Sequence, residues 1–577
     1  MKRWSKYVKP YLLSFILGPV GMIVEVIGEM FMPLILAGII NDGLAGTLTV
    51  GSSIGYACAL IGIVLLMMTG GVAGAYFGSK ASVNFAADLR RDVYAKVQQY
   101  SFANIDKFST GSLVTRMTND VTQLQNFVNM LLRMALRSPG MFIGGIIMAI
   151  ILKPSLSVVL AVTMPLMIMV IFVLIRIGFP RFNALQKKID KLNSRVRENV
   201  TNVRVVKSFV REDFEGDKFE GDNADLKNTA MRAVKTVIFM GPIMTVFMHA
   251  TVIAVIWLGH GSVLAGEMPV GDLSAFITYT TQILSSLMMV TMLLMNFSRA
   301  MASGKRICEV LDEKIDITDT ESAESDRMVE RGSISFKNVS YRYYKNSEEA
   351  VLNNINLDIE AGSTVGIIGS TGCGKTTLIS MIPRLYDVDS GEVLIDGVNV
   401  KDYPLVNLRD GIGIVLQKNL LFSGTISDNL RWGDNDATYE EIITASEHSA
   451  SHKFVSTFGD GYDTMLDKGG MNLSGGQKQR LCIARALLKK PKILILDDST
   501  SAVDTATEAQ IRNALKNDLP ECTKLIIAQR ISSVMDADKI IVMNDGRITG
   551  VGTHEYLLDN NAEYSEIYYS QMDRKEA

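Results

Sequence analysis

The sequence is poor in cysteine and has no excess of positive charge. Its five cysteines form no Cys-x-x-Cys pair and no cluster, so neither a disulfide framework nor a zinc site is indicated. The 58 lysines and arginines are set against 61 aspartates and glutamates, for a net charge of −3, which gives no general attraction for nucleic acid. The sequence therefore predicts a chain exposed to a reducing compartment, with no DNA or RNA partner.

Long stretches of the first half lack charged residues. There is no charge between residues 43 and 79, only Lys153 between 138 and 175, and only two acidic residues between 236 and 298. Such runs are typical of helices that cross a lipid bilayer. We therefore expect six membrane helices, at about residues 11–40, 54–78, 130–152, 156–178, 236–260 and 273–297.

Lysine and arginine indicate the orientation of these helices. Both residues are abundant before the first span and in the segments 79–129 and 179–235, and absent from the short connections near Asp42 and Glu267. Because positively charged loops stay on the cytoplasmic side, we expect both termini and both long segments in the cytosol. The two segments keep a helical pattern, so we expect them to extend the spans beyond the membrane.

Two carboxylates interrupt the first apolar run. Glu25 and Glu29 are four residues apart, and therefore lie on one face of a helix. A carboxylate at membrane depth is costly unless it faces water or a partner. The pair fits recognition of a cationic or polar cargo, and equally fits a structural pairing with Arg133 and Arg137. The sequence does not choose between these two interpretations.

The composition changes near residue 320. Apolar, strand-like segments then alternate with helical ones, as in a soluble α/β domain. The expected fold is multidomain, with an all-α transmembrane domain of six helices at residues 1–320 and an α/β domain at residues 321–577.

A phosphate-binding loop opens the second domain. In STVGIIGSTGCGKTTLI, four residues separate Gly369 from Gly374-Lys375-Thr376, between an apolar strand and a helix. Backbone N–H groups of such a loop converge on phosphates, the lysine neutralises the outer phosphates, and the hydroxyl binds Mg²⁺. We expect ATP and Mg²⁺ as the ligands. The residues expected to bind them here are Gly369, Ser370, Thr371, Gly372, Cys373, Gly374, Lys375, Thr376 and Thr377.

Two further segments fit phosphate chemistry. Asp497 ends the apolar strand KILILDD, where its carboxylate can hold Mg²⁺ through the water shell of the ion. The segment LSGGQ opens a helix and offers a second phosphate-binding helix start. Its candidate binding residues are Ser474, Gly475, Gly476 and Gln477.

Together these motifs resemble those of the ATP-binding-cassette (ABC) transporters, of the exporter type with the membrane domain fused ahead of the nucleotide-binding domain. In family order they are NVSYRY, GSTGCGKTT, GIVLQKNLLFSGTISDNL, LSGGQKQR, ILILDD, SAVD and IIAQR. The resemblance covers essentially the whole chain, and implies an α/β P-loop domain with the ABC-type helical subdomain. It also implies that two such domains pair head to tail, with each ATP between the P-loop of one and the LSGGQ of the other.

The resemblance implies roles for further residues. Tyr343 would stack on adenine, Gln417 would bind Mg²⁺ and join it to the membrane domain, and Asp504 would cross the interface. ATP binding would close the paired domains. Transverse tips at about residues 101–117 and 203–213 would transmit that closure to the membrane helices.

Three positions depart from the family pattern. Asp498 follows the magnesium-binding aspartate where the family normally has the catalytic glutamate, and Gln529 replaces the histidine of the switch segment IIAHR. Lys468 stands where a glutamate usually precedes LSGGQ, which puts the usual contact to the partner's transverse helix in doubt. Because both catalytic positions change while the ATP-binding residues are kept, we expect a degenerate site that binds ATP with little turnover.

This pattern resembles one subunit of bacterial heterodimeric ABC exporters, often multidrug pumps. The expected partner is a second half-transporter that supplies glutamate and histidine and whose hydrolytic site Ser474 completes. The expected cargo is a small amphiphilic, drug-like compound, with lipid or peptide left open, and the expected location is the bacterial cytoplasmic membrane. Two alternatives remain open: an active homodimer that uses Asp498, and a subunit that senses ATP without pumping.

Overall fold

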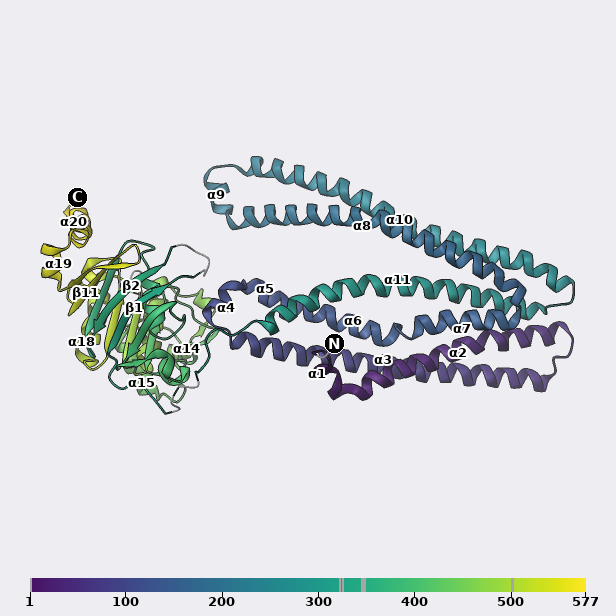
Figure 1. Ribbon diagram of the computed structural model, residues 1–577, viewed down its shortest axis with the longest axis horizontal. Coiled ribbons are helices and arrows are strands. Elements are labelled where there is room, and N and C mark those ends of the chain that lie inside the picture. The colour runs from purple at the N-terminus through teal and green to yellow at the C-terminus, as the bar shows by residue number, and fades with distance from the viewer. Residues whose placement is uncertain (1–2, 321–322, 324–325, 344–348, 500–502, 577) are drawn as a thin grey trace. The chain divides into compact units, whose positions relative to one another are not determined.

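The computed structural model describes residues 3–320, 323, 326–343, 349–499 and 503–576 (Figure 1). It contains two compact units. The N-terminal unit comprises Met1–Val97 and Gly111–Asp312, and the C-terminal unit comprises Gln98–Thr110 and Glu313–Ala577. The predicted domain limits, 1–320 and 321–577, stay a prediction, because these units are defined by contacts between residues and not by independent folding. The compact units depart from these limits mainly at Gln98–Thr110, a stretch that overlaps the predicted first transverse tip and belongs to the C-terminal unit.

The described part of the N-terminal unit is helical. Short turns or short helices join its long helices. The short helices include α4 (Phe102–Lys107), α5 (Thr110–Thr115) and α9 (Val203–Ser208) (Figure 1). The long helices are α2 (Leu12–Leu44), α3 (Val50–Gln98), α6 (Val121–Met134), α7 (Arg137–Leu152), α8 (Pro154–Thr201), α10 (Glu212–Leu264) and α11 (Val270–Asp312).

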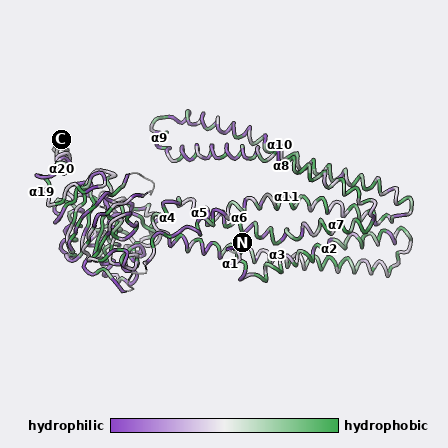
Figure 2. The backbone as a smooth tube through the Cα atoms, viewed as in Figure 1, coloured by the Kyte–Doolittle hydropathy of each residue, from purple (hydrophilic) through white to green (hydrophobic). Residues whose placement is uncertain are grey.

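Six helical stretches among the described residues are long and apolar enough to cross a membrane. They are Ser5–Leu44, Val50–Gln98, Thr110–Leu152, Pro154–Thr201, Glu212–Leu264 and Val270–Val290, which confirms the six predicted spans. The 53 residues of α10 extend for about 80 Å, well beyond a hydrocarbon core of about 30 Å. Figure 2 shows hydrophobic residues in one half of α8 and α10 and hydrophilic ones in the half that meets α9. The chain is therefore a multi-pass membrane protein.

Helices α2 and α3 approach closely at glycines. A Cβ on Gly21 would lie 2.6 Å from the carbonyl oxygen of Gly70, and a Cβ on Gly70 would lie 2.8 Å from that of Gly21. Small residues allow such backbone contact between membrane helices. Glu25, one turn beyond Gly21, consequently lies against α3, because its Oε2 is 3.2 Å from where a Cβ on Gly71 would be.

The C-terminal unit contains an α/β domain, as predicted. A six-stranded sheet has the order β12-β11-β3-β10-β9-β6, and a four-stranded antiparallel sheet has the order β2-β1-β4-β5. All pairs of the larger sheet are parallel except β11 with β12. The strands of the larger sheet are β3 (Thr364–Gly369), β6 (Ile412–Val415), β9 (Ile493–Asp497), β10 (Thr523–Ile527), β11 (Lys539–Asn544) and β12 (Arg547–Gly552). Those of the smaller sheet are β1 (Ile334–Tyr341), β2 (Leu352–Ile359), β4 (Ser390–Ile395) and β5 (Val398–Asn399).

The larger sheet is buried on both faces. Neighbouring residues of β3 enter different hydrophobic cores: Ile367 packs with the smaller sheet, whereas Ile368 packs with the helical part around α17 (Gly475–Leu488). Strands buried on both faces read as continuous apolar runs, which explains STVGIIG and KILILDD. Because the parallel strands β3, β9 and β10 share one direction, their carboxyl ends meet at one edge, where ligands of open α/β sheets bind.

Candidate nucleotide-binding site

The P-loop lies at the carboxyl end of β3 and ends where α12 (Lys375–Met381) begins. Gly374 caps this helix with φ +98°, a conformation that side chains other than glycine disfavour. Gly369 has φ +152°, and a Cβ there would collide with the carbonyl oxygen of Met543. The backbone can therefore make this tight strand-to-helix turn only with glycine at these positions.

Two side chains of α12 lie at the mouth of this loop. Lys375 Nζ donates hydrogen bonds to the carbonyl oxygens of Gly369 at 2.8 Å and Ser370 at 2.7 Å. Thr376 Oγ1 donates to Asp497 Oδ2 at 2.9 Å. The ammonium group is thus held over the loop whose backbone N–H groups would bind phosphate.

Asp497 is 2% exposed at the end of β9. Burial, reinforced by the adjacent charge of Asp498, raises the pKa of its carboxyl. Hydroxyl and carboxylate oxygens are ligands that Mg²⁺ accepts together with waters and nucleotide phosphates. Among the described residues no group of three or more His, Cys, Asp or Glu side chains could hold a metal. Because a hydroxyl and a carboxylate oxygen lie together here, the pair Thr376 and Asp497 fits a Mg²⁺ ion that is bound jointly with phosphates.

The two atypical residues contact each other. Gln529 Nε2 donates a hydrogen bond to Asp498 Oδ2 at 2.8 Å. Burial raises the pKa of Asp498, and hydrogen bonds from Gln417 and Gln529 oppose that shift. Asp498 has φ +49°, which costs free energy for a residue with a side chain. The carboxylate is therefore fixed by two amide side chains.

Tyr343 lies beside the P-loop helix. Its hydroxyl is 3.0 Å from Thr377 Oγ1, and its ring makes edge contacts with Tyr341 at 5.2 Å and Tyr386 at 5.4 Å between centroids. The side chain is 44% exposed, which leaves ring surface for the predicted stacking on a base.

The LSGGQ residues lie in a different place from the P-loop. Ser474 caps α17: its Oγ accepts from the N–H of Gln477 at 3.3 Å, and its own N–H donates to Gln477 Oε1 at 2.9 Å. A cavity of about 370 Å³ is lined by Ser474, Gly475, Gly476, Arg480, Val503 and Asp504. The structure therefore brings the signature residues and Asp504 together and leaves the P-loop out of this cavity.

Arg480 is a lining residue that the sequence reasoning missed. Its guanidinium lies 4.7 Å from the ring centroid of Phe454 and donates to the carbonyl oxygen of Ala450 at 3.0 Å. Burial lowers its pKa. The sequence could have indicated this residue, because Arg480 follows Gly476 of LSGGQKQR by four positions and residues four apart share a helix face.

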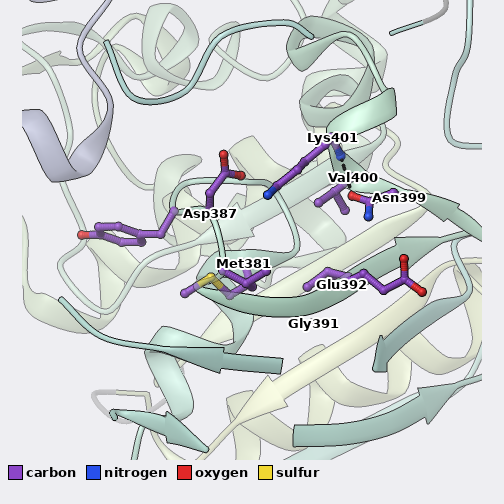
Figure 3. A pocket seen from close by; sticks show the side chains of 10 residues that line it. Met381, Asp387, Gly391, Glu392, Asn399, Val400 and Lys401 are labelled. Atoms are coloured by element: carbon purple, nitrogen blue, oxygen red, sulfur yellow. Dashed lines mark hydrogen bonds between the residues drawn. The ribbon is translucent and has the colours of Figure 1, made fainter. Parts of the chain in front are cut away.

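Figure 3 shows a second pocket, in the smaller-sheet region. Its volume of about 10 Å³ suffices for about one water molecule. Its lining includes Met381, Asp387, Glu392 and Lys401 but no P-loop or signature residue. It is therefore too small for a nucleotide.

The intramembrane carboxylates pair with one of the two predicted arginines. Arg137 lies 3.2 Å from Glu25 and 2.6 Å from Glu29, whereas Arg133 is exposed and makes no ion pair within the described ranges. The structural pairing therefore forms with Arg137, and two carboxylates share one guanidinium.

The chain matches two protein families. Residues 15–287 match the ABC transporter transmembrane region, and residues 352–501 match the ABC transporter domain. The chain is 39% identical to the "Uncharacterized ABC transporter ATP-binding protein YfiB" of Bacillus subtilis, over 100% of this chain and 99% of that protein. It is 32% identical to the "Putative multidrug export ATP-binding/permease protein YgaD" of the same organism, over 99% of each.

Solved structures agree on the fold. A bacterial Atm1-family ABC exporter with ATP bound has a TM-score of 0.75 and 24% identity, over 98% of both chains. Within the described residues, six candidate membrane helices thus precede a P-loop domain in one chain. This chain therefore belongs to the ABC transporter family, with the ABC transporter transmembrane region fused ahead of the ATP-binding domain in one chain.

Proposed function

We propose that this chain is one subunit of a heterodimeric, ATP-driven exporter. It binds ATP with Mg²⁺ in a site of low hydrolytic activity, and its LSGGQ segment completes the hydrolytic site of a different partner half-transporter. The partner supplies the glutamate and histidine that this chain replaces.

One observation carries this proposal, the hydrogen bond of 2.8 Å between Gln529 and Asp498. Hydrolysis needs a carboxylate that polarises the attacking water and a group that contacts the γ-phosphate. Here the carboxylate is one methylene shorter than glutamate, and the residue at the switch position already bonds to it. The ATP-binding groups Lys375, Thr376 and Asp497 are all present. These features favour retained binding with reduced turnover.

The cavity at LSGGQ supports a role in trans. It measures about 370 Å³ and is lined by Ser474 and Asp504 without any P-loop residue. Backbone N–H groups at the start of α17 would meet the phosphates of a nucleotide held by another chain. Ser474 thus serves the partner's ATP.

A small amphiphilic compound is the proposed cargo. YgaD, whose name refers to multidrug export, is similar along its whole length. In this cluster the two carboxylates of Glu25 and Glu29 share the single guanidinium of Arg137, an arrangement that favours positively charged compounds. The distribution of lysine and arginine supports a cytoplasmic-membrane location with the ATPase domain and both termini in the cytosol.

The test is ATP turnover of the purified chain, alone and co-expressed with its candidate partner. We expect negligible turnover alone, a rise with the partner, and loss of that rise on Ser474→Ala. Robust Mg²⁺-dependent turnover of the chain alone, abolished by Asp498→Asn, would identify an active homodimer instead. Export that persists after the partner's hydrolytic site is destroyed would identify an ATP sensor.

A further inference from the structure

The C-terminal helix α20 (Ala562–Glu576) contacts the switch segment through one side chain. Gln571 Nε2 donates a hydrogen bond to the carbonyl oxygen of Gln529 at 2.8 Å, and the N–H of Ile531 donates to Gln571 Oε1 at 2.9 Å. The amide side chain thus pairs with the backbone as a neighbouring strand would. Two bonds of opposite direction restrict both translation and rotation of the segment between these residues.

The first turns of α20 are anchored independently. Glu563 accepts hydrogen bonds from Asn544 Nδ2 at 2.8 Å and Thr549 Oγ1 at 2.6 Å, which ties the helix to β11 and β12. Tyr564 is fully buried, and its hydroxyl is 2.7 Å from His554 Nδ1. A helix fixed at its start presents Gln571, two turns later, at a defined place.

The contact continues from the switch backbone to the degenerate site. The side chain of Gln529 bonds to Asp498, and the backbone of Gln529 bonds to Gln571. The N–H of Ile531 is one of the donors at the start of a short helix, Ile531–Ser533, which have no partner within their own helix. Gln571 supplies that partner. The switch segment is therefore held by Asp498 through the side chain of Gln529, and by Gln571 through its backbone.

We propose that Gln571 is a positioning residue which fixes the switch segment so that Gln529 stays on Asp498, and that α20 thereby slows the release of ATP from this site. A segment that is already ordered loses less conformational entropy when it closes over a nucleotide. A segment released from α20 would open locally more often. The inference rests on the proposed function, because it requires a site that retains ATP.

The experiment uses the full-length chain assembled with its candidate partner, whose own P-loop lysine is replaced by alanine. Radiolabelled ATP is bound with Mg²⁺, and its release is followed after excess unlabelled ATP is added. Gln571→Ala removes both hydrogen bonds, and we expect release about tenfold faster. The matched control is Ser570→Ala, which removes only a hydroxyl bonded to Ile567 within the same helix, and should leave the rate unchanged.

A double substitution separates positioning from general support of the fold. If Gln571 acts through Gln529, then Gln571→Ala has no further effect in a Gln529→Ala background. A tenfold acceleration in that background as well would overturn the proposal, as would an unchanged rate in Gln571→Ala alone. If Gln571→Ala lowers the melting temperature, the same assay is applied to Gln571→Glu, which keeps the acceptor for Ile531 and loses the donor to Gln529. Faster release in this variant supports the proposal, and an unchanged rate of release overturns it.

Failure of the proposed function has a different signature. It would show as labelled ADP formed at this site in the unsubstituted chain, whatever the effect of Gln571. Release of intact ATP at equal rates with and without Gln571→Ala would contradict the role of α20 alone.

Discussion

At the scale of single residues, two adjacent aspartates have different surroundings. Asp497 accepts a hydrogen bond from the magnesium-binding candidate Thr376, and Asp498 accepts one from Gln529. Burial raises the pKa of both carboxyls. In the proposed function, the first carboxylate is a ligand for Mg²⁺, whereas the second, which would activate water, already accepts a hydrogen bond.

Lys375 is predicted to supply much of the affinity for ATP. Lys375→Met keeps the apolar stem and removes the ammonium group. In the unsubstituted chain this group donates hydrogen bonds to two carbonyl oxygens of the P-loop. Loss of a charge-assisted hydrogen bond of about 2 kcal/mol predicts binding about thirtyfold weaker. Calorimetric titration with ATP measures this. Lys453→Met, on the exposed face of another helix, is the control and should bind normally; equal affinities for both variants would refute the role of Lys375.

At the scale of elements, hydrogen bonds to Asp396 connect the segment that precedes β1 with the turn between β4 and β5. Its two carboxylate oxygens accept from the backbone N–H groups of Glu330, Arg331, Gly332 and Ser333, at 2.9–3.0 Å. Asp396→Asn replaces one acceptor by a donor facing N–H groups. We expect a loss of about 2 kcal/mol in the free energy of unfolding, measured by denaturant titration.

The same substitution should show a defined pH dependence. Burial would raise the pKa of Asp396, but the backbone donors bring it below its usual value. A carboxyl whose pKa is lower in the folded state contributes stability above its unfolded pKa of about 3.9, and loses that contribution as the pH falls through the folded value. The difference between the unsubstituted chain and Asp396→Asn should therefore shrink below about pH 4. Asp358→Asn, at an exposed hydrogen bond to Ser335, should show little difference at any pH.

Arg137, at the start of α7, contacts Glu25 and Glu29 of α2. In the part of the chain that the structure describes, it is the only cation that forms an ion pair with these two carboxylates. Arg137→Met would leave two carboxylates without a partner at membrane depth, for a loss of about 3–5 kcal/mol. We expect a lower melting temperature in detergent, restored in part by adding Glu29→Gln. Arg133→Met should be neutral. A stable Arg137→Met protein would show that water or cargo can replace the arginine.

The sequence alone predicted the local features, such as the membrane spans and the P-loop. It did not predict which of several possible side chains make a long-range contact. Uncharged runs predict spans because each span must itself be apolar, and glycine spacing predicts the P-loop because the turn is local. The spacing of Arg133 and Arg137 matched the two glutamates equally well. Only the packing of α7 selects Arg137. Likewise, no local pattern connects Gln571 with Gln529, which are 42 residues apart.

At the scale of the whole molecule, the proposed function requires that ATP binding in the C-terminal domain changes the arrangement of the membrane helices. Within the C-terminal unit, the hydroxyl of Tyr386 donates to Asp106 Oδ2 at 2.8 Å, and its ring contacts Phe102 at 6.1 Å; both partners lie in α4 (Phe102–Lys107). The same ring also contacts Tyr343, with 5.4 Å between the ring centroids. The predicted adenine-stacking residue and the first transverse tip therefore touch the same side chain.

Tyr386→Phe is predicted to weaken this connection without removing the ring. Losing a hydrogen bond to a carboxylate costs about 1.5–3 kcal/mol, so we expect the ratio of transport to ATP hydrolysis to fall about tenfold. ATP affinity should be unchanged, and simultaneous transport and hydrolysis assays measure the ratio. Lys107→Gln, which removes an exposed ion pair of the same helix with Glu313 at 2.7 Å, should have a small effect. An unchanged ratio in Tyr386→Phe would exclude this route of transmission.

The most direct test of the account concerns hydrolysis at this chain's own site. The transporter is assembled with a partner whose catalytic glutamate is replaced by glutamine, so that only this site can turn over ATP. We predict turnover near background for the unsubstituted chain, and clearly measurable turnover after Asp498→Glu is combined with Gln529→His. Equal, substantial turnover with and without these two substitutions would show that Asp498 and Gln529 support hydrolysis, and would contradict the account.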